Sequence, residues 1–152
     1  MTPITSAGLA RLKQNLITLK AELVRTFDEK REAAAEGDLK ENSAYIFMGE
    51  RAIVLQTQIE ETSNSIKDAV LITPPTEINE VQIGHKVKVL FNNDNREMII
   101  ILVGKDDNAI KAGWVSHTSP IGIALMGKSV NDKVDVNGQP VTILEISLGE
   151  IE

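Results

Sequence analysis

The chain has 152 residues, enough for one ordinary domain or two small ones, and a composition of 42% hydrophobic but only 3% aromatic residues predicts an aliphatic core. The formal net charge of −6 is spread over both halves, which argues against free nucleic acid as a direct partner because phosphate binding needs a basic face. The absence of cysteine excludes disulfides and thiolate metal sites. No membrane span or secretory signal is recognisable, so we expect a cytoplasmic protein with no membrane partner.

The first predicted element is a long helix that begins at Thr5 or Ser6, either of which can cap it. Its apolar residues step by three or four positions, the spacing of one helical stripe. They are Leu9, Leu12, Leu16, Leu19, Leu23 and Phe27. Alanines at 33–35 continue this helix to Gly37, where we expect a turn because glycine is a poor helix former.

A second helix is expected to start near Asp38, and its apolar residues follow a heptad pattern. They are Tyr45, Met48, Ala52, Leu55, Ile59, Thr62, Ile66 and Ala69. Two matched stripes joined by a short turn predict an antiparallel coiled-coil hairpin over residues 1–73, with arms of about 45 Å at 1.5 Å per residue. Because a two-helix hairpin buries only one stripe per helix, its length suggests reach rather than stability.

The pattern changes at Thr73-Pro74-Pro75-Thr76, where two prolines stop a helix and stiffen the link, so we place the domain boundary there. Residues 74–152 are predicted to form strands and one short helix. The strands are expected at His85–Phe91, Glu97–Val103, Ala109–Val115, Asp132–Val136 and Val141–Ile146, and the helix at Pro120–Lys128. The Asn137-Gly138 pair is a hairpin turn signal. Helices followed by strands give an α+β protein with a small antiparallel sheet.

The turn between the two helices carries the candidate site. Asp38 is a good N-cap, and Glu41 follows three residues later, so both carboxylates point the same way if the next turn is helical. Two carboxylates on a projecting tip form half of a metal site. The alternative is a helix cap followed by an acid that the helix dipole favours, since such pairs are common at helix starts.

The segment Gly37-Asp38-Leu39-Lys40-Glu41-Asn42, followed by Tyr45, resembles the tip motif of the Gre transcript cleavage factors of bacterial RNA polymerase. Two further signatures lie in the matching order. Ile4-Thr5 with Gly8 and Leu12 resembles the start of the family's first helix, and Ser119-Pro120-Ile121, Leu125 and Gly127-Lys128 resemble its C-terminal signature. The resemblance therefore covers nearly the whole chain, and the acidic charge balance favours the GreA type.

The resemblance implies a mechanism. The hairpin would enter the polymerase's secondary channel, and an FKBP-like domain would dock at the channel rim through Ser119, Pro120 and Ile121. Asp38 and Glu41 would help to hold a second Mg²⁺ of the polymerase active site, supported at the tip by Gly37, Leu39, Lys40, Asn42 and Tyr45. Two-metal chemistry explains the need for carboxylates. The protein would have no cofactor of its own, would act as a monomer, and would stimulate the polymerase without being an enzyme.

The sequence departs from the family pattern beside the tip. Ala44 stands where many members have an acid, and Gly49 stands where members often have a basic residue that contacts the extruded RNA. Arg51 follows two residues later and would not share a face with Gly49. The flanking Ile46 and Phe47 are unusually apolar and could pack with Leu39 to stiffen the tip.

Other functions stay open at this point. A regulator of the same shape could block the polymerase channel without promoting cleavage. An FKBP-like domain suggests a peptidyl-prolyl isomerase. The substrate pocket of such an enzyme needs aromatic walls, however, and this domain has only two aromatic residues, Phe91 and Trp114. A plain coiled-coil module would self-associate along its seam. We expect Trp114 to be buried or half-buried, and His85 and His117 to have surface or strand-end roles.

Overall fold

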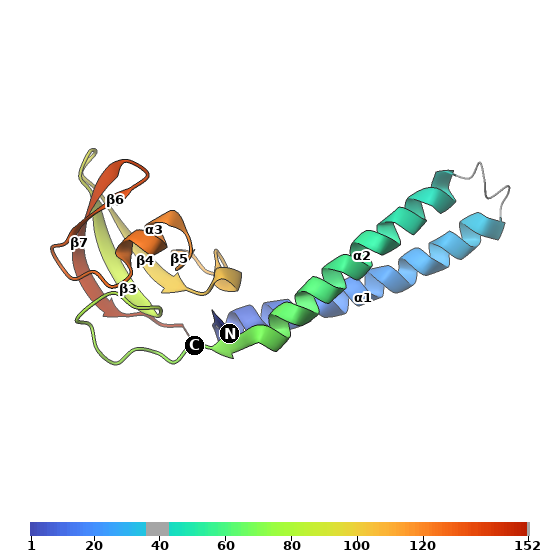
Figure 1. Cartoon of the computed structure of the whole chain (residues 1–152), viewed down its shortest axis with the longest axis horizontal. Coiled ribbons are helices and arrows are strands. Elements are labelled where there is room, and N and C mark those ends of the chain that lie inside the picture. The colour runs from blue at the N-terminus through green and yellow to red at the C-terminus, as the bar shows by residue number, and fades with distance from the viewer. Residues whose placement is uncertain (36–42, 152) are drawn as a thin grey trace. The chain divides into compact units, whose positions relative to one another are not determined.

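The computed structural model describes residues 1–35 and 43–151 (Figure 1). The described chain forms two compact units, one of residues Met1–Leu9 with Ala69–Glu152 and one of Ala10–Asp68. The first unit is discontinuous because strand β1 (Thr2–Ile4) pairs in parallel with strand β2 (Ala69–Leu71). Neither strand was predicted from the sequence, since each is only three residues long. No helix in the described part of the chain is long and apolar enough to cross a membrane.

Two long helices, α1 (Ser6–Ala35) and α2 (Ser43–Asp68), run antiparallel as predicted (Figure 1). Along α2 the predicted seam is confirmed, with Ala52 and Leu55 buried. Along α1 the prediction is wrong at Phe27, which is 38% exposed, whereas Thr26 is only 7% exposed and Ala33 is buried. Alternate steps of three and four lead from Leu23 to Thr26, so the polar threonine and not the apolar phenylalanine faces the partner helix. The expected start of α2 near Asp38 lies outside the described residues.

The other unit is built on a five-stranded sheet in the order β5-β4-β3-β7-β6. Its strands are β3 (His85–Phe91), β4 (Arg96–Val103), β5 (Trp114–Ser116), β6 (Lys133–Val136) and β7 (Gln139–Leu148), and the short helices are η1 (Lys105–Asp107) and α3 (Pro120–Leu125). The predicted α+β class is confirmed, but the sheet is mixed, because β5 runs parallel to β4. The loop after β4, which contains η1, carries the chain back far enough for β5 to pair with the last three residues of β4, from Ile101 to Val103.

Alternation along the strands places the core on one face of the sheet. Val87, Val89 and Phe91 are buried while Lys86 is exposed, as period-two patterning predicts. Asn137 and Gly138 connect β6 to β7 with φ of 52° and 83°, the positive values that an Asn-Gly hairpin turn requires. The predicted strand over Ala109–Val115 is reduced to β5, because turns and bends occupy residues 109–113.

The two histidines and the tryptophan have distinct environments. Trp114 is buried, as predicted. His85 begins β3 but is fully buried, so a surface role for it is wrong. The Gln82 N–H donates to its Nδ1 (2.9 Å), and its Nε2 therefore carries the proton and donates to the Glu77 carbonyl (2.6 Å). The half-buried His117 places Nδ1 3.1 Å from the Val103 carbonyl. Both imidazole rings therefore contact backbone groups of this unit.

Candidate functional site

The predicted catalytic and metal-binding residues, Asp38 and Glu41, lie outside the described residues. So do four of the five predicted supporting residues: Gly37, Leu39, Lys40 and Asn42. The fifth, Tyr45, lies in the first turn of α2 and is half-buried against α1. In residues 1–35 and 43–151, no group of three or more acidic or histidine side chains could hold a metal ion. The site at the tip therefore stays a prediction, and the structure describes the helix ends that flank it.

One side of these helix ends forms what we call the Tyr45 groove, a depression of about 480 Å³ lined by Phe27, Lys30, Arg31, Ala34 and Tyr45. The Lys30 ammonium reaches across from α1 and lies 4.9 Å from the centre of the Tyr45 ring. A cation over an aromatic face is attracted by the ring's quadrupole, so this contact joins the two helices near their turn. Tyr45 thus closes the hairpin, as its place in the seam predicted.

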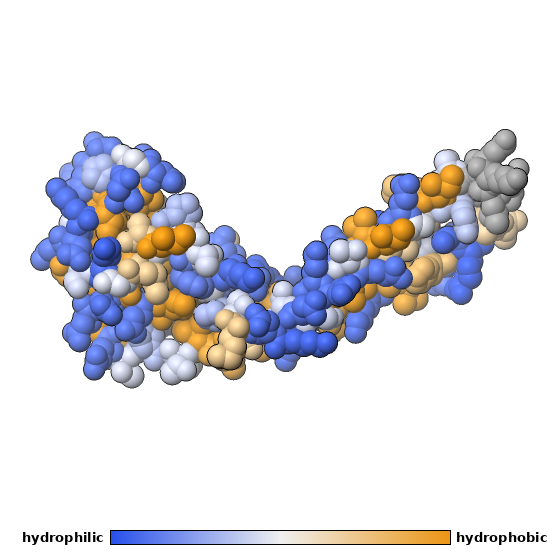
Figure 2. Space-filling model, viewed as in Figure 1, coloured by the Kyte–Doolittle hydropathy of each residue, from blue (hydrophilic) through white to orange (hydrophobic). Residues whose placement is uncertain are grey.

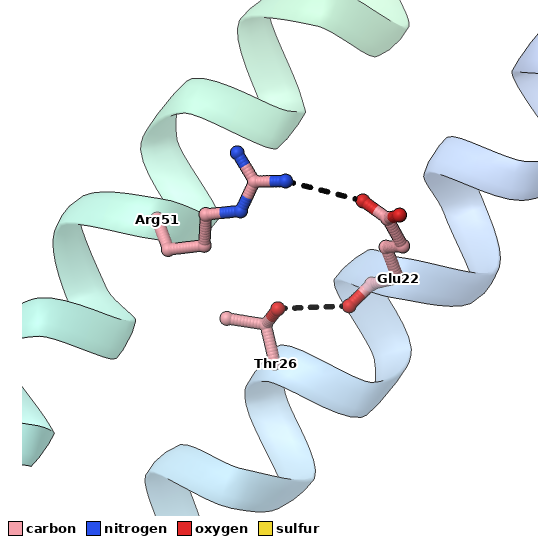
Figure 3. Close-up of polar contacts among 3 residues, drawn as sticks. All are labelled: Glu22, Thr26 and Arg51. Carbon is pink, nitrogen blue, oxygen red and sulfur yellow. Dashed lines mark hydrogen bonds and ion pairs between the residues drawn. The ribbon is translucent and has the colours of Figure 1, made fainter.

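A second depression between the two helices, which we call the Arg51 groove, is lined by residues that include Glu22, Thr26, Phe47 and Arg51. Arg51 Nη2 lies 3.2 Å from Glu22 Oε2, and Thr26 Oγ1 donates to the Glu22 carbonyl at 2.8 Å (Figure 3). Both charged side chains are partly exposed, so the pair stabilises the hairpin by less than about 1 kcal/mol. Arg51 therefore lines a different groove from Tyr45, where it is paired with Glu22.

The apolar residues that follow the turn remain at the surface. Ile46 is 49% and Phe47 59% exposed, and hydrophobic side chains are visible at the surface of the hairpin in Figure 2. Their predicted packing with Leu39 involves a residue outside the described ranges. A surface of this kind on a narrow hairpin is typical of a segment that is covered by a partner.

The predicted docking residues, Ser119, Pro120 and Ile121, form the start of α3. Ser119 caps this helix, accepting from the Gly122 N–H (3.1 Å) and donating to the Ser116 carbonyl (2.6 Å), and Pro120 follows at the first helical position. Ile121 is half-buried against the core. Ile123, which was not predicted from the sequence, is 67% exposed one turn after Pro120 and extends the same surface.

The start of α1 depends on a residue that the sequence analysis also missed. Asp107, in η1, is fully buried and accepts hydrogen bonds from the Thr5 N–H (2.9 Å), the Thr5 hydroxyl (2.6 Å) and the Gly104 N–H (3.0 Å). Thr5 Oγ1 in turn accepts from the Gly8 N–H (3.0 Å). A Cβ on Gly8 would lie 1.8 Å from Asp107 Oδ1, so only glycine fits there. The Thr5 and Gly8 motif is therefore explained by a carboxylate about a hundred residues later.

Comparison with known proteins finds related sequences over nearly the whole chain. A family model described as "Transcription elongation factor, N-terminal" matches residues 2–71, and one described as "Transcription elongation factor, GreA/GreB, C-term" matches residues 75–148. Transcription elongation factor GreA of Thermodesulfovibrio yellowstonii is 34% identical over 142 residues, covering 92% of this chain and 90% of the relative. GreA of Helicobacter hepaticus is also 34% identical, over 98% of this chain and 95% of the relative.

Among solved structures, the GreA factor homolog 1 (Gfh1) protein of Thermus thermophilus aligns with a TM-score of 0.45 at 19% identity, over 97% of this chain and 99% of that chain. The family models and the relatives define the class of protein as a transcription elongation factor. Within that class, the chain belongs to the GreA/GreB family.

Proposed function

We propose that this protein binds bacterial RNA polymerase, inserts its hairpin into the secondary channel and stimulates the cleavage of backtracked RNA by the polymerase. The observation that carries the proposal is the acidic motif from Gly37 to Asn42, which lies in the sequence between two antiparallel helices of about 45 and 39 Å, in a chain of the GreA/GreB family. Such a hairpin can carry two carboxylates to a reaction centre that a compact domain could not enter.

Asp38 and Glu41 are the residues that would act at the reaction centre. Carboxylate oxygens are the donors that Mg²⁺ prefers, so the donor set fits a shared magnesium ion of the polymerase. When bound, that ion supplies an activated water and stabilises charge in an in-line displacement. The two side chains would hold the ion and orient its water, while the polymerase provides the remaining catalytic groups. The protein has no reaction of its own under this proposal.

The surface at the start of α3 would dock on the rim of the channel. Pro120 and Ile123 are exposed there, and Ser119 fixes the local backbone by capping the helix. We therefore expect Ser119→Ala with Ile123→Asp to raise the dissociation constant for polymerase without changing the chemistry at the tip. An isomerase function is disfavoured, because Phe91 and Trp114, the aromatic residues of this unit, are buried in the core and unable to line an open pocket.

The experiment that tests the proposal uses a stalled and backtracked bacterial RNA polymerase, from the same source as the protein, with magnesium. We expect the protein to shorten the RNA from its 3′ end, and Asp38→Asn with Glu41→Gln to abolish this activity while polymerase binding remains. The matched control is Glu60→Gln with Glu61→Gln, which makes the same charge change on exposed residues of α2. Cleavage that survives in the double amide variant would contradict the tip mechanism.

A second candidate function is a regulator that occupies the channel without promoting cleavage. The exposed Ile46 and Phe47 favour it, because apolar side chains near the turn would strengthen contact with a channel wall. This candidate predicts that the wild-type protein binds polymerase and slows nucleotide addition but leaves the backtracked RNA intact. The same assay therefore separates the two functions.

A further inference from the structure

The hairpin carries exposed apolar side chains at regular helical spacing outside its seam. On α1, Ile17 and Val24 are 62% and 61% exposed and stand seven residues apart. On α2, Ile46 and Ile53 have the same spacing and are 49% and 65% exposed. Residues seven apart share a face of a helix, so each pair forms a stripe along its helix axis. Phe27, three residues after Val24, continues the α1 stripe into the Tyr45 groove.

Both stripes border the Tyr45 groove. Gly49 stands three residues after Ile46 and four before Ile53, so it belongs to the α2 stripe. The Lys30 Nζ, which lies over the ring of Tyr45, is 3.7 Å from the position that a Cβ on Gly49 would take. The α2 stripe therefore runs beside the groove that Phe27 borders from α1. We call the two stripes, with the groove between them, the Tyr45 face.

The shape of the Tyr45 face suits a third helix. Its stripes follow the helix axes, and the one on α1 extends about 15 Å from Ile17 to Phe27 at 1.5 Å per residue. Because Gly49 has no side chain, the face has a hollow of about 480 Å³ between the helices. A large apolar side chain of a helix lying along the face would enter this hollow, as a knob enters a hole in packed helices.

The charges on the Tyr45 face are positive. Lys20 lies within the α1 stripe, and the positions three and four residues away from it are all apolar. Lys30 contributes a second cation, held against the Tyr45 ring. In residues 17–34 and 46–56, the positions that make up the two stripes hold no aspartate or glutamate. The Arg51 groove differs, since its lining includes Glu22 and Glu29. A complementary partner of the Tyr45 face would therefore carry carboxylates beside its apolar side chains.

Two other kinds of partner fit this surface poorly. Four of the five exposed apolar residues are aliphatic and offer no ring on which bases could stack, which disfavours nucleic acid. A second copy of the chain would bring the same face of both molecules together in a symmetric dimer. Lys20 and Lys30 of the two copies would then meet like charges, and such juxtaposition opposes association.

We propose that the Tyr45 face binds one α-helix of the polymerase, an amphipathic helix whose apolar stripe is bordered by carboxylates. Its apolar side chains pack on the two stripes and fill the hollow at Gly49, and its carboxylates pair with Lys20 and Lys30. This inference rests on the proposed function, because the polymerase supplies the helix. It assigns this contact to one face of the hairpin and leaves the row of Phe47, Arg51 and Val54 outside it.

The first test is photocrosslinking in the complex of the full chain with purified polymerase, followed by mapping of the captured peptide. A photoreactive amino acid is placed at position 24, 53 or 54. We expect positions 24 and 53, although they lie on different helices, to capture the same helical segment of the polymerase. Its apolar residues should recur at steps of three and four beside aspartate or glutamate. Position 54 should capture another segment or none.

A pair of neighbouring substitutions measures the contribution of the face to binding. Ile53→Asp removes an apolar contact and places a carboxylate against the acidic helix, so we expect it to raise the dissociation constant for polymerase about tenfold. Val54→Asp is the matched control, because Val54 is also exposed and follows directly on α2. We expect the control to change the constant less than about twofold. Equal effects of the two variants would overturn the inference.

Charge reversal tests the carboxylates of the partner. Lys20→Glu should raise the dissociation constant severalfold at low ionic strength, and the difference from wild type should shrink at high ionic strength because salt screens the charges. Arg25→Glu makes the same charge change at an exposed residue that lines the Arg51 groove, and should have a smaller effect. Circular dichroism of all four variants confirms that the helices are retained. A larger effect of Arg25→Glu would contradict the inference.

The outcomes separate this inference from the proposed function when RNA cleavage is measured on the same complexes. Capture of one acidic helix by positions 24 and 53 without RNA cleavage would support the inference and refute the proposed function. Cleavage in a complex where these positions capture RNA, a second copy of the chain, or a segment without carboxylates would support the proposed function and overturn the inference. A wild-type protein that does not bind polymerase would overturn both.

Discussion

At the scale of single residues, one buried carboxylate holds the first turn of α1. Asp107 accepts hydrogen bonds from two donors of Thr5 and from the Gly104 N–H. The Thr5 hydroxyl oxygen in turn accepts a hydrogen bond from the Gly8 N–H. Each of these donors is buried and would otherwise be unsatisfied. Because leaving such groups without partners costs more than a hydrogen bond contributes, the stability of this helix start should depend strongly on Asp107.

Replacing Asp107 with alanine should lower the free energy of unfolding by about 3 kcal/mol, because buried donors lose a charged acceptor. Urea denaturation followed by circular dichroism measures this difference. The matched control is Asp135→Ala, an exposed aspartate on β6, for which we expect a change within about 0.5 kcal/mol. Equal stability of the two variants would show that the Asp107 hydrogen bonds contribute little.

The two helical glycines, Gly8 and Gly49, should respond to alanine in opposite directions. Gly49→Ala should stabilise the protein by roughly 0.5–1 kcal/mol, since its Cβ makes only ordinary contacts and alanine is the better helix former. Gly8→Ala should destabilise it by more than about 1 kcal/mol, because its Cβ would meet Asp107 Oδ1 at 1.8 Å. The same urea titrations compare the two variants. Stabilisation by both would contradict the close approach at Gly8.

At the scale of elements, the hairpin shows what periodicity can and cannot predict. The heptad pattern of α2 identified its seam, because side chains three and four residues apart share a face whatever their chemistry. Near the end of α1, the hydrophobic pattern predicted Phe27 as the seam residue, whereas Thr26 occupies that place. The threonine is tolerated inside because its hydroxyl donates to the Glu22 carbonyl, a bond that hydrophobicity does not reveal.

Truncation of seam and surface residues should separate these roles. Leu55→Ala should cost about 3 kcal/mol, since Leu55 is fully buried, whereas Phe27→Ala should cost less than about 1 kcal/mol. Thermal unfolding followed by helical circular dichroism would measure both. A large loss of stability in Phe27→Ala would restore the stripe that the sequence suggested.

The strands show a similar division between local and distant signals. The alternation of apolar and polar residues predicted β3, and Asn137-Gly138 predicted the turn before β7, because both signals lie in neighbouring residues. Strands β1 and β2 were missed because each depends on a partner more than sixty residues away, as Thr2 pairs with Ala69. For the same reason, the tip acids were recognisable as a motif, but the approach of the Lys30 ammonium on α1 to Gly49 on α2 was not, since it joins two helices.

At the scale of the whole molecule, the discontinuous unit shows that the linker prolines are not its boundary, because residues that precede them in the chain pack in the same unit as the sheet. Residues before the prolines, such as Ile72, and residues from the start of the chain, such as Ala7, pack against the cluster of Val103, Trp114 and Ile151. A fragment of residues 74–152 would lack both, together with Thr5. Its sheet would be intact, but one side of this cluster and one carboxylate would lose their partners.

We therefore expect the 74–152 fragment to unfold at a lower urea concentration than the full chain, as reported by the fluorescence of Trp114, the protein's one tryptophan. Asp107→Ala should destabilise the fragment less than the full chain, because Thr5 is already absent and the two losses are coupled. Equal effects of the substitution in both backgrounds would show that Thr5 and Asp107 act independently.

The parallel pairing of β1 with β2 has a consequence for how this chain can change. Because Thr2 and Ala69 are held side by side, everything between them is an insertion into one folded unit, with both of its ends fixed. Removing seven residues from each helix would keep the seam in register and shorten the hairpin by about 10 Å. The length of the hairpin can thus vary in whole heptads while the paired strands β1 and β2 at its base stay the same. The distance that the hairpin spans can therefore evolve independently of the sheet unit.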